Sequence, residues 1–89
     1  MRIGDDFVEN NDIVNAHVCS SYNRKQLSKV DLCGCFYCLK KFNPKLIVEW
    51  CDNGETAICP FCGIDSILYD CKTYPVTDKL LEEMNKYWF

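Results

Sequence analysis

The N-terminal part of the chain has few apolar positions. Residues 1–18 are rich in Asp, Glu and Asn, and their apolar side chains are scattered. This pattern predicts an arm that is loosely ordered at its start, with Ile13 and Val14 docked on the rest of the protein. We therefore divide the chain into an N-terminal arm over residues 1–18 and a single domain over residues 19–89.

Two later segments carry apolar residues at helical spacing. In the first, Ser20 and Ser21 offer N-caps for a helix over about residues 21–30, with a weak apolar stripe. In the second, Thr77 is placed to cap a helix that runs toward the C-terminus. The apolar positions of this second helix are Leu80, Leu81, Met84, Tyr87 and Trp88. We expect most of this stripe to pack on the core and its aromatic end to stay partly exposed.

The pattern between these segments favours strands. Residues 45–50 have a strand composition, although Leu46 and Ile47 alternatively begin a short helical turn. The Asp-Asn-Gly sequence at 52–54 is a strong hairpin signal, and residues 55–58 then form the return strand. Residues 63–69 predict a short helix.

Four cysteines in two pairs predict a metal site. Cys35 and Cys38 form one Cys-x-x-Cys pair, and Cys59 and Cys62 form a second pair after twenty intervening residues. Two residues between paired cysteines let a tight turn aim both sulfurs at one point, and two such turns complete the tetrahedron that Zn²⁺ prefers. We therefore expect one structural Zn²⁺ per chain, held by these four cysteines, with the hairpin returning Cys59 to the metal.

These elements together predict a small α+β zinc-binding domain. We call each Cys-x-x-Cys turn a knuckle, so that Cys35 and Cys38 belong to the first knuckle and Cys59 and Cys62 to the second. A knuckle, a hairpin and a second knuckle at the start of a helix form a treble-clef-like core, here flanked by an N-terminal and a C-terminal helix. Helix amides would then point at the sulfurs of the second knuckle and stabilise their charge. The alternative is a zinc ribbon, in which both knuckles lie in hairpins.

The remaining cysteines and the single histidine leave alternatives open. Eight cysteines in a secreted chain would suggest four disulfides, but the acidic, Asn-rich N-terminus has no apolar run. We therefore expect a cytoplasmic protein in which Cys19, Cys33, Cys51 and Cys71 are free thiols. Cys33 is an alternative to Cys35 as a ligand. His17 and Cys19 are candidates for a second metal site, although a polar surface role is the simpler interpretation of His17.

The charge of the chain bears on its partners. The formal net charge is −3, which disfavours non-specific binding to phosphates. The bases lie in small groups, of which Arg24-Lys25 and Lys40-Lys41 are the clearest. A nucleic-acid surface near the first knuckle would combine these bases with the rings of Phe36, Tyr37 and Phe42.

The two knuckles and the C-terminus also carry a resemblance. The motifs are Cys33-Gly34-Cys35-Phe36-Tyr37-Cys38, Cys59-Pro60-x-Cys62-Gly63-Ile64-Asp65-Ser66 and the terminal Trp88-Phe89. Over about residues 16–89 the chain resembles a largely uncharacterised family of small bacterial cytoplasmic proteins, which implies a zinc protein and little about its biochemistry. The core is also similar to the treble clef of HNH nucleases, but its hairpin lacks the histidine that those enzymes use as general base.

We expect a zinc-stabilised binding module rather than an enzyme. A closed four-cysteine site leaves no coordination position for water, and the sole histidine has no local partner. A protein partner is favoured, as for an inhibitor, immunity or regulatory protein, with Tyr87, Trp88 and Phe89 as the contact surface or as a homodimer contact. The alternatives are a nucleic-acid-binding zinc finger and, less favoured, a redox or nuclease-like enzyme. No segment is long and apolar enough to indicate a membrane span.

Overall fold

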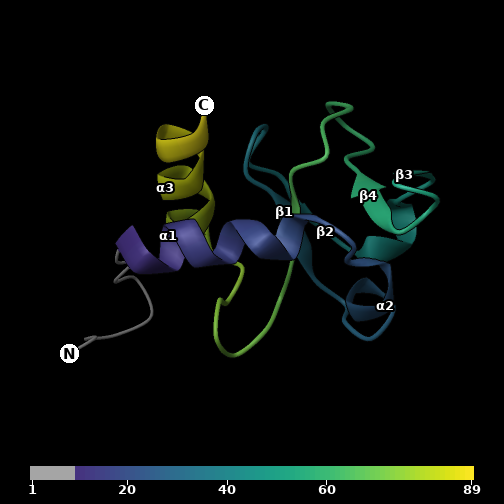
Figure 1. The fold of residues 1–89 in the computed structure, drawn as a ribbon, viewed down its shortest axis with the longest axis horizontal. Helices are drawn as coiled ribbons and strands as arrows, with labels where there is room; N and C mark the ends of the chain where they lie inside the picture. Colours follow the sequence, from purple (N-terminus) through teal and green to yellow (C-terminus); the bar gives the residue numbers. More distant parts are fainter. Residues whose placement is uncertain (1–9) are drawn as a thin grey trace.

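The computed structural model describes residues 10–89 (Figure 1). The expected loose order at the start of the arm concerns residues 1–9, which lie outside the described residues. In chain order the elements are α1 (Asn10–Ala16), the 3₁₀ helix η1 (His17–Ser20), α2 (Arg24–Leu27), β1 (Cys33–Cys35), β2 (Lys41–Phe42), the 3₁₀ helix η2 (Pro44–Leu46), β3 (Glu49–Cys51), β4 (Thr56–Ile58), β5 (Ile67–Tyr69) and α3 (Asp78–Trp88).

A three-stranded antiparallel sheet divides the interior into two apolar clusters. Its strand order is β2-β1-β5, and Cys33 lies opposite Phe42 on one side and Tyr69 on the other. Successive side chains of a strand point to opposite faces. Accordingly Ile67 belongs to one cluster and its neighbour Leu68 to the other. The two clusters therefore share the backbone of this sheet as their boundary.

Helices α1 and α3 cover the first face of the sheet (Figure 1). The cluster there contains Ile13, Ala16, Phe36, Leu68, Val76, Leu80, Leu81 and Met84. A Cβ on Gly34 would lie 2.8 Å from Val76 Cγ1 and 2.9 Å from Leu81 Cδ1. The missing side chain at Gly34 is therefore what lets α3 approach β1 closely.

The second face packs against α2 and the β3–β4 hairpin. This cluster contains Leu27, Cys33, Cys35, Phe42, Ile47, Ala57, Cys59 and Ile67. Asn23 joins its parts, because its side-chain nitrogen donates to the carbonyl oxygens of Cys19 and Ile67, both at 2.9 Å, and its oxygen accepts from Ala57 N at 3.2 Å. One buried amide thus connects η1, β4 and β5, a role that the sequence did not indicate.

Several expected elements are confirmed. The side-chain oxygen of Thr77 accepts from Leu80 N at 3.1 Å and caps α3. The hairpin forms, with Asp52 and Asn53 in the left-handed region at φ 53° and 60°. Ile13 docks as expected, with 4% of its surface exposed. The expected docking of Val14 is wrong, because Val14 lies on the outer side of α1 and is 43% exposed.

Other expectations are wrong in extent or type. The helix expected over 21–30 is only the single turn of α2, and residues 45–50 begin in η2, so the helical-turn alternative is correct there. The helix expected over 63–69 is wrong: residues 67–69 form β5, because Ile67 and Leu68 are both buried, on opposite faces of the sheet. The treble-clef assignment, which needs a helix at the second knuckle, is therefore not confirmed.

No helix among the described residues is long and apolar enough to cross a bilayer.

Replacing Asn23 with Ala should lower the free energy of unfolding by about 1–3 kcal/mol or more, because the buried N–H of Ala57 and the carbonyl of Ile67 lose their partner. Urea denaturation in the presence of zinc measures the change. The exposed neighbour Gln26 provides the control, since Gln26→Ala should alter stability by no more than about 0.5 kcal/mol. Equal stability of the two variants would contradict this role of Asn23.

Candidate metal centre

The two Cys-x-x-Cys turns have the same backbone construction. In the first, Leu39 N donates to Cys35 O at 2.8 Å and Cys35 N donates to Lys40 O at 3.0 Å. In the second, Gly63 N donates to Cys59 O and Cys59 N donates to Ile64 O, both at 2.9 Å. The fifth residue of each turn is left-handed, with φ 68° at Leu39 and 78° at Gly63. The chain therefore builds two equivalent knuckles.

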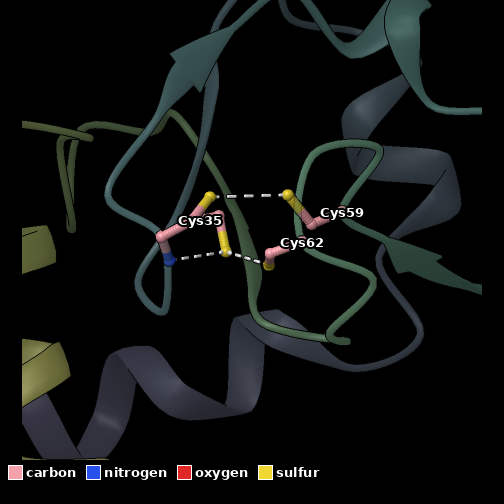
Figure 2. Close-up of side chains that lie close together, drawn as sticks. Cys35, Cys59 and Cys62 are labelled. Atoms are coloured by element: carbon pink, nitrogen blue, oxygen red, sulfur yellow. Dashed lines mark hydrogen bonds between the residues drawn. The ribbon is translucent and has the colours of Figure 1, made fainter.

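Different parts of the fold position the two knuckles. The first connects β1 to β2 within one hairpin, whereas the second connects β4 of the small sheet to β5 of the larger one. Figure 2 shows the sulfurs of Cys35, Cys59 and Cys62 turned toward one another across the gap between these loops. The pairing of β5 with β1 holds the end of the second loop beside the first knuckle.

The four paired cysteines converge on one point. The sulfurs of Cys35, Cys38, Cys59 and Cys62 all lie within 4.8 Å of one another. Cys35 Sγ is 3.6 Å from Cys62 Sγ, and Cys38 Sγ is 3.7 Å from Cys59 Sγ. A tetrahedron with Zn–S bonds of about 2.3 Å has sulfurs about 3.8 Å apart, so the observed spacing fits the ion. The cluster is thus compatible with a zinc-binding module.

Hydrogen-bond donors surround the sulfur of Cys35. The Ser66 hydroxyl lies 3.0 Å from Cys35 Sγ, and the backbone N–H groups of Tyr37 and Cys38 donate to the same sulfur at 3.4 and 3.5 Å. Burial opposes ionisation of Cys35, but these hydrogen bonds outweigh it and lower the pKa of the thiol. The fold therefore favours the thiolate form of Cys35. Ser66 lies thirty-one positions from Cys35 in the chain, so the motif that contains Ser66 did not indicate this contact.

Burial has the opposite effect on two other members. It raises the pKa of Cys38 and of Cys62, and the neighbouring thiol of Cys35 raises both further. Four thiolates at this spacing therefore need a cation to offset their charge, and the ion and the ionised sulfurs would assemble together.

Cys33 lies beside the cluster without belonging to it. Its side chain is fully buried and its thiol donates to Phe42 O at 3.4 Å. Burial, followed by the nearby Cys59 and Cys35, raises the pKa of Cys33 to about 12. Cys33 is therefore a neutral thiol at pH 7, and it is Cys35 that the fold places with the other three sulfurs.

The remaining candidate ligands are dispersed. The ring of His17 lies 4.0 Å from that of Trp88, and Cys71 accepts from Tyr74 N at 3.4 Å. Within residues 10–89 the four-cysteine cluster is the only group of three or more Cys, His, Asp or Glu residues close enough to share an ion. The second site considered for His17 and Cys19 is thus not assembled, and all eight cysteines are free of disulfides.

Serine substitution should separate the cluster from the other cysteines. Each of Cys35→Ser, Cys38→Ser, Cys59→Ser and Cys62→Ser should lose bound zinc and folded structure, because site formation and folding are one equilibrium. Elemental analysis and circular dichroism of the purified variants measure both. Cys51→Ser and Cys71→Ser are the matched controls and should keep one zinc per chain. Zinc loss in either control, or two ions per wild-type chain, would show that the ligand set is different.

Removing the Ser66 hydroxyl should weaken zinc binding without removing a ligand. Ser66→Ala takes away a hydrogen bond to Cys35 Sγ, and losses of this kind typically reduce metal affinity 10–100-fold. Competition with a chromophoric chelator gives the affinity. The exposed Ser21 provides the control, and Ser21→Ala should bind zinc as the wild type does. An unchanged affinity in Ser66→Ala would contradict the assigned role.

Comparison with known proteins adds no family to this geometry. No family model, no curated protein and no solved structure matches the chain. The resemblance to small bacterial proteins therefore stays a prediction, and the metal centre rests on the convergence of its four sulfurs.

Proposed function

We propose that the protein is a small binding module, stabilised by one structural Zn²⁺ at the four cysteines, that acts by contacting a protein partner. The observation that supports this most is a group of exposed aromatic rings beside the metal centre. We call it the aromatic surface and define it as Tyr37, Tyr87, Trp88 and Phe89. Their exposed fractions are 46%, 54%, 37% and 59%.

The rings of this surface contact one another across two elements. Phe89, at the end of α3, meets Tyr37 of the first knuckle edge to face at 4.8 Å. Tyr87 meets Trp88 at 4.8 Å, again edge to face. Exposed apolar patches and clustered aromatic side chains are typical of protein interfaces, because large rigid rings bury much area at little entropic cost. The surface is thus suited to a protein partner or to a second copy of this chain.

The metal centre supports the shape of the aromatic surface. Tyr37 lies between the two cysteines of the first knuckle, and its backbone N–H donates to Cys35 Sγ. The side-chain nitrogen of Asn85 donates to Tyr37 O at 3.0 Å and so fastens α3 to the knuckle. Loss of zinc would therefore disturb the position of Tyr37 and of the ring that packs on it.

The chemistry of the centre favours binding over catalysis. Four cysteines complete a tetrahedral zinc and leave no open position for a water or a substrate. His17, the single histidine, is packed on the ring of Trp88. We therefore propose that the protein is not an enzyme.

The nucleic-acid alternative near the first knuckle has less support. Phe36 and Phe42 are buried, so Tyr37 alone of the three rings is exposed for stacking on a base. Lys41 forms an ion pair with Asp78 at 3.1 Å, and the Lys40 ammonium lies 5.5 Å from the ring centre of Phe61. The bases expected to hold phosphates are thus partly engaged within the protein.

Polar substitutions in the aromatic surface should abolish partner binding and leave the zinc in place. The double variant Tyr87→Ser/Phe89→Ser removes two exposed rings that lie outside both apolar clusters. Zinc-loaded wild type and variant are compared in pull-downs from the native cell extract and by sedimentation for self-association. A partner or a dimer that is lost only in the variant supports the proposal.

A lysine variant provides the control for this experiment. Lys40→Ala/Lys41→Ala should retain the partner, while a mobility-shift titration at low and moderate salt tests its nucleic-acid binding. Salt-sensitive binding to DNA or RNA that this variant abolishes would overturn the proposal in favour of a nucleic-acid module, since each neutralised phosphate releases counterions.

A further inference from the structure

A cavity lies at the opposite end of the molecule from the aromatic surface. It is lined by α2 and the turn after it, by η2, and by Trp50 of β3, and its volume is about 360 Å³. Figure 1 shows α2 and the β3–β4 hairpin together at this end, away from α1 and α3. None of the four clustered cysteines lines it. Its size is within the range of small-molecule sites, at the low end, and is too small for a folded partner.

The cavity is positive in a protein that is negative overall. Arg24, Lys29 and Lys45 line it, against the single carboxylate of Asp31, whereas the whole chain has a formal charge of −3. Lys29 and Lys45 take no part in the ion pairs formed among residues 10–89. The lining therefore carries an excess of positive charge around one concave site, which favours an anionic ligand.

Arg24 is held in place without losing its charge. Its guanidinium lies 4.5 Å from the ring centre of Trp50, and Nη1 donates to Gly54 O at 2.8 Å. Both contacts are to neutral groups, so the cation stays available to a ligand. A guanidinium has five N–H donors, and that of Arg24 uses one of them to donate to Gly54 O. A charged arginine with free N–H donors binds phosphate oxygens, and its flat guanidinium also offers a face on which rings stack.

The rest of the lining combines apolar side chains with one further hydrogen-bond donor. Leu27 is buried and, with Val30 and Pro44, supplies apolar surface to the cavity. The side-chain oxygen of Asn43 accepts from Lys45 N at 2.9 Å, which leaves the amide nitrogen of Asn43 as a donor. The lining thus combines cations and a hydrogen-bond donor with apolar groups and the Arg24–Trp50 pair.

We propose that this cavity binds a nucleotide, meaning a phosphate monoester carried on a nucleoside. The phosphate, with about two negative charges at pH 7, would be held by Arg24, Lys29 and Lys45, and it matches the excess of two positive charges in the lining. The flat base lies against the Arg24–Trp50 pair. A free nucleotide and the phosphorylated end of single-stranded DNA or RNA both present a phosphate monoester on a nucleoside. This site is independent of the aromatic surface and of the partner proposed for it.

The test uses the zinc-loaded full chain, labelled with ¹⁵N and titrated with AMP, adenosine and inorganic phosphate. Both tryptophans give indole N–H signals, and Trp88, which lies in the aromatic surface, is the internal reference. AMP should shift the Trp50 signal saturably and leave that of Trp88 in place, and it should bind at least about tenfold more tightly than adenosine or phosphate alone, because each of those ligands lacks half of the contacts.

Two double variants, each of which removes two positive charges, test whether AMP binds in the cavity. Lys29→Ala/Lys45→Ala removes two cations from the lining and should weaken AMP binding at least about tenfold. Lys25→Ala/Lys72→Ala removes two exposed lysines that do not line the cavity and should leave AMP binding unchanged. All four side chains are exposed, and the zinc content of each variant verifies its fold.

A 5′-phosphorylated oligonucleotide and a glutamate-rich peptide complete the set of ligands. Tighter binding of the oligonucleotide than of AMP, weakened by the Lys29/Lys45 variant, supports a strand end as the source, and equal affinity supports the free nucleotide. Three results would overturn the proposal: no saturable shift of Trp50 below about 1 mM AMP, equal losses in the two double variants, or stronger binding of the peptide, which would make the cavity a site for acidic peptides.

Discussion

The convergence of four cysteine sulfurs within 4.8 Å is the constraint on which the fold depends. Ionised sulfurs this close repel one another, and burial raises the pKa of Cys38 and of Cys62, which adds to the cost of their charge. A dication held by the four cysteines would offset both effects, and it would tie the β1–β2 hairpin to the loop between β4 and β5. The two sheets, which share no strand, are therefore connected at the knuckles, by the amide of Asn23 and by the second apolar cluster, to which Ala57 and Ile67 both belong.

The link between the two knuckles matters for stability because the apolar interior of the protein is divided. The sheet β2-β1-β5 separates two small clusters, one under α1 and α3 and the other around the sulfurs. Chains of this size bury too little apolar surface for a large stability margin, and a structural metal is a common remedy. Gly34 brings α3 against one face of β1, while Cys33 and Cys35 pack on the other, so a single three-residue strand serves both clusters.

The same architecture gives the molecule two chemically different ends. At one end Asn85 fastens α3 to the first knuckle, which brings Phe89 onto Tyr37 and creates an exposed aromatic surface. At the other end Arg24 reaches from α2 to the hairpin turn and lies on Trp50, which forms one wall of a positive cavity. Neither feature uses a cysteine of the metal centre, yet both depend on segments that the centre and Asn23 hold in position.

The sequence by itself determined the features that depend on neighbouring residues. The spacing of the two cysteine pairs, the Asp-Asn-Gly turn and the Thr77 cap are local, because turn geometry and capping involve only a few adjacent residues. Tertiary structure decided the rest. Residues 67–69 are a strand because β1 supplies their hydrogen-bond partners, and the contacts of Asn23 with Ile67 and of Ser66 with Cys35 join positions forty-four and thirty-one residues apart. Such pairings leave no periodic pattern in the chain, since they are set by which elements the fold brings together.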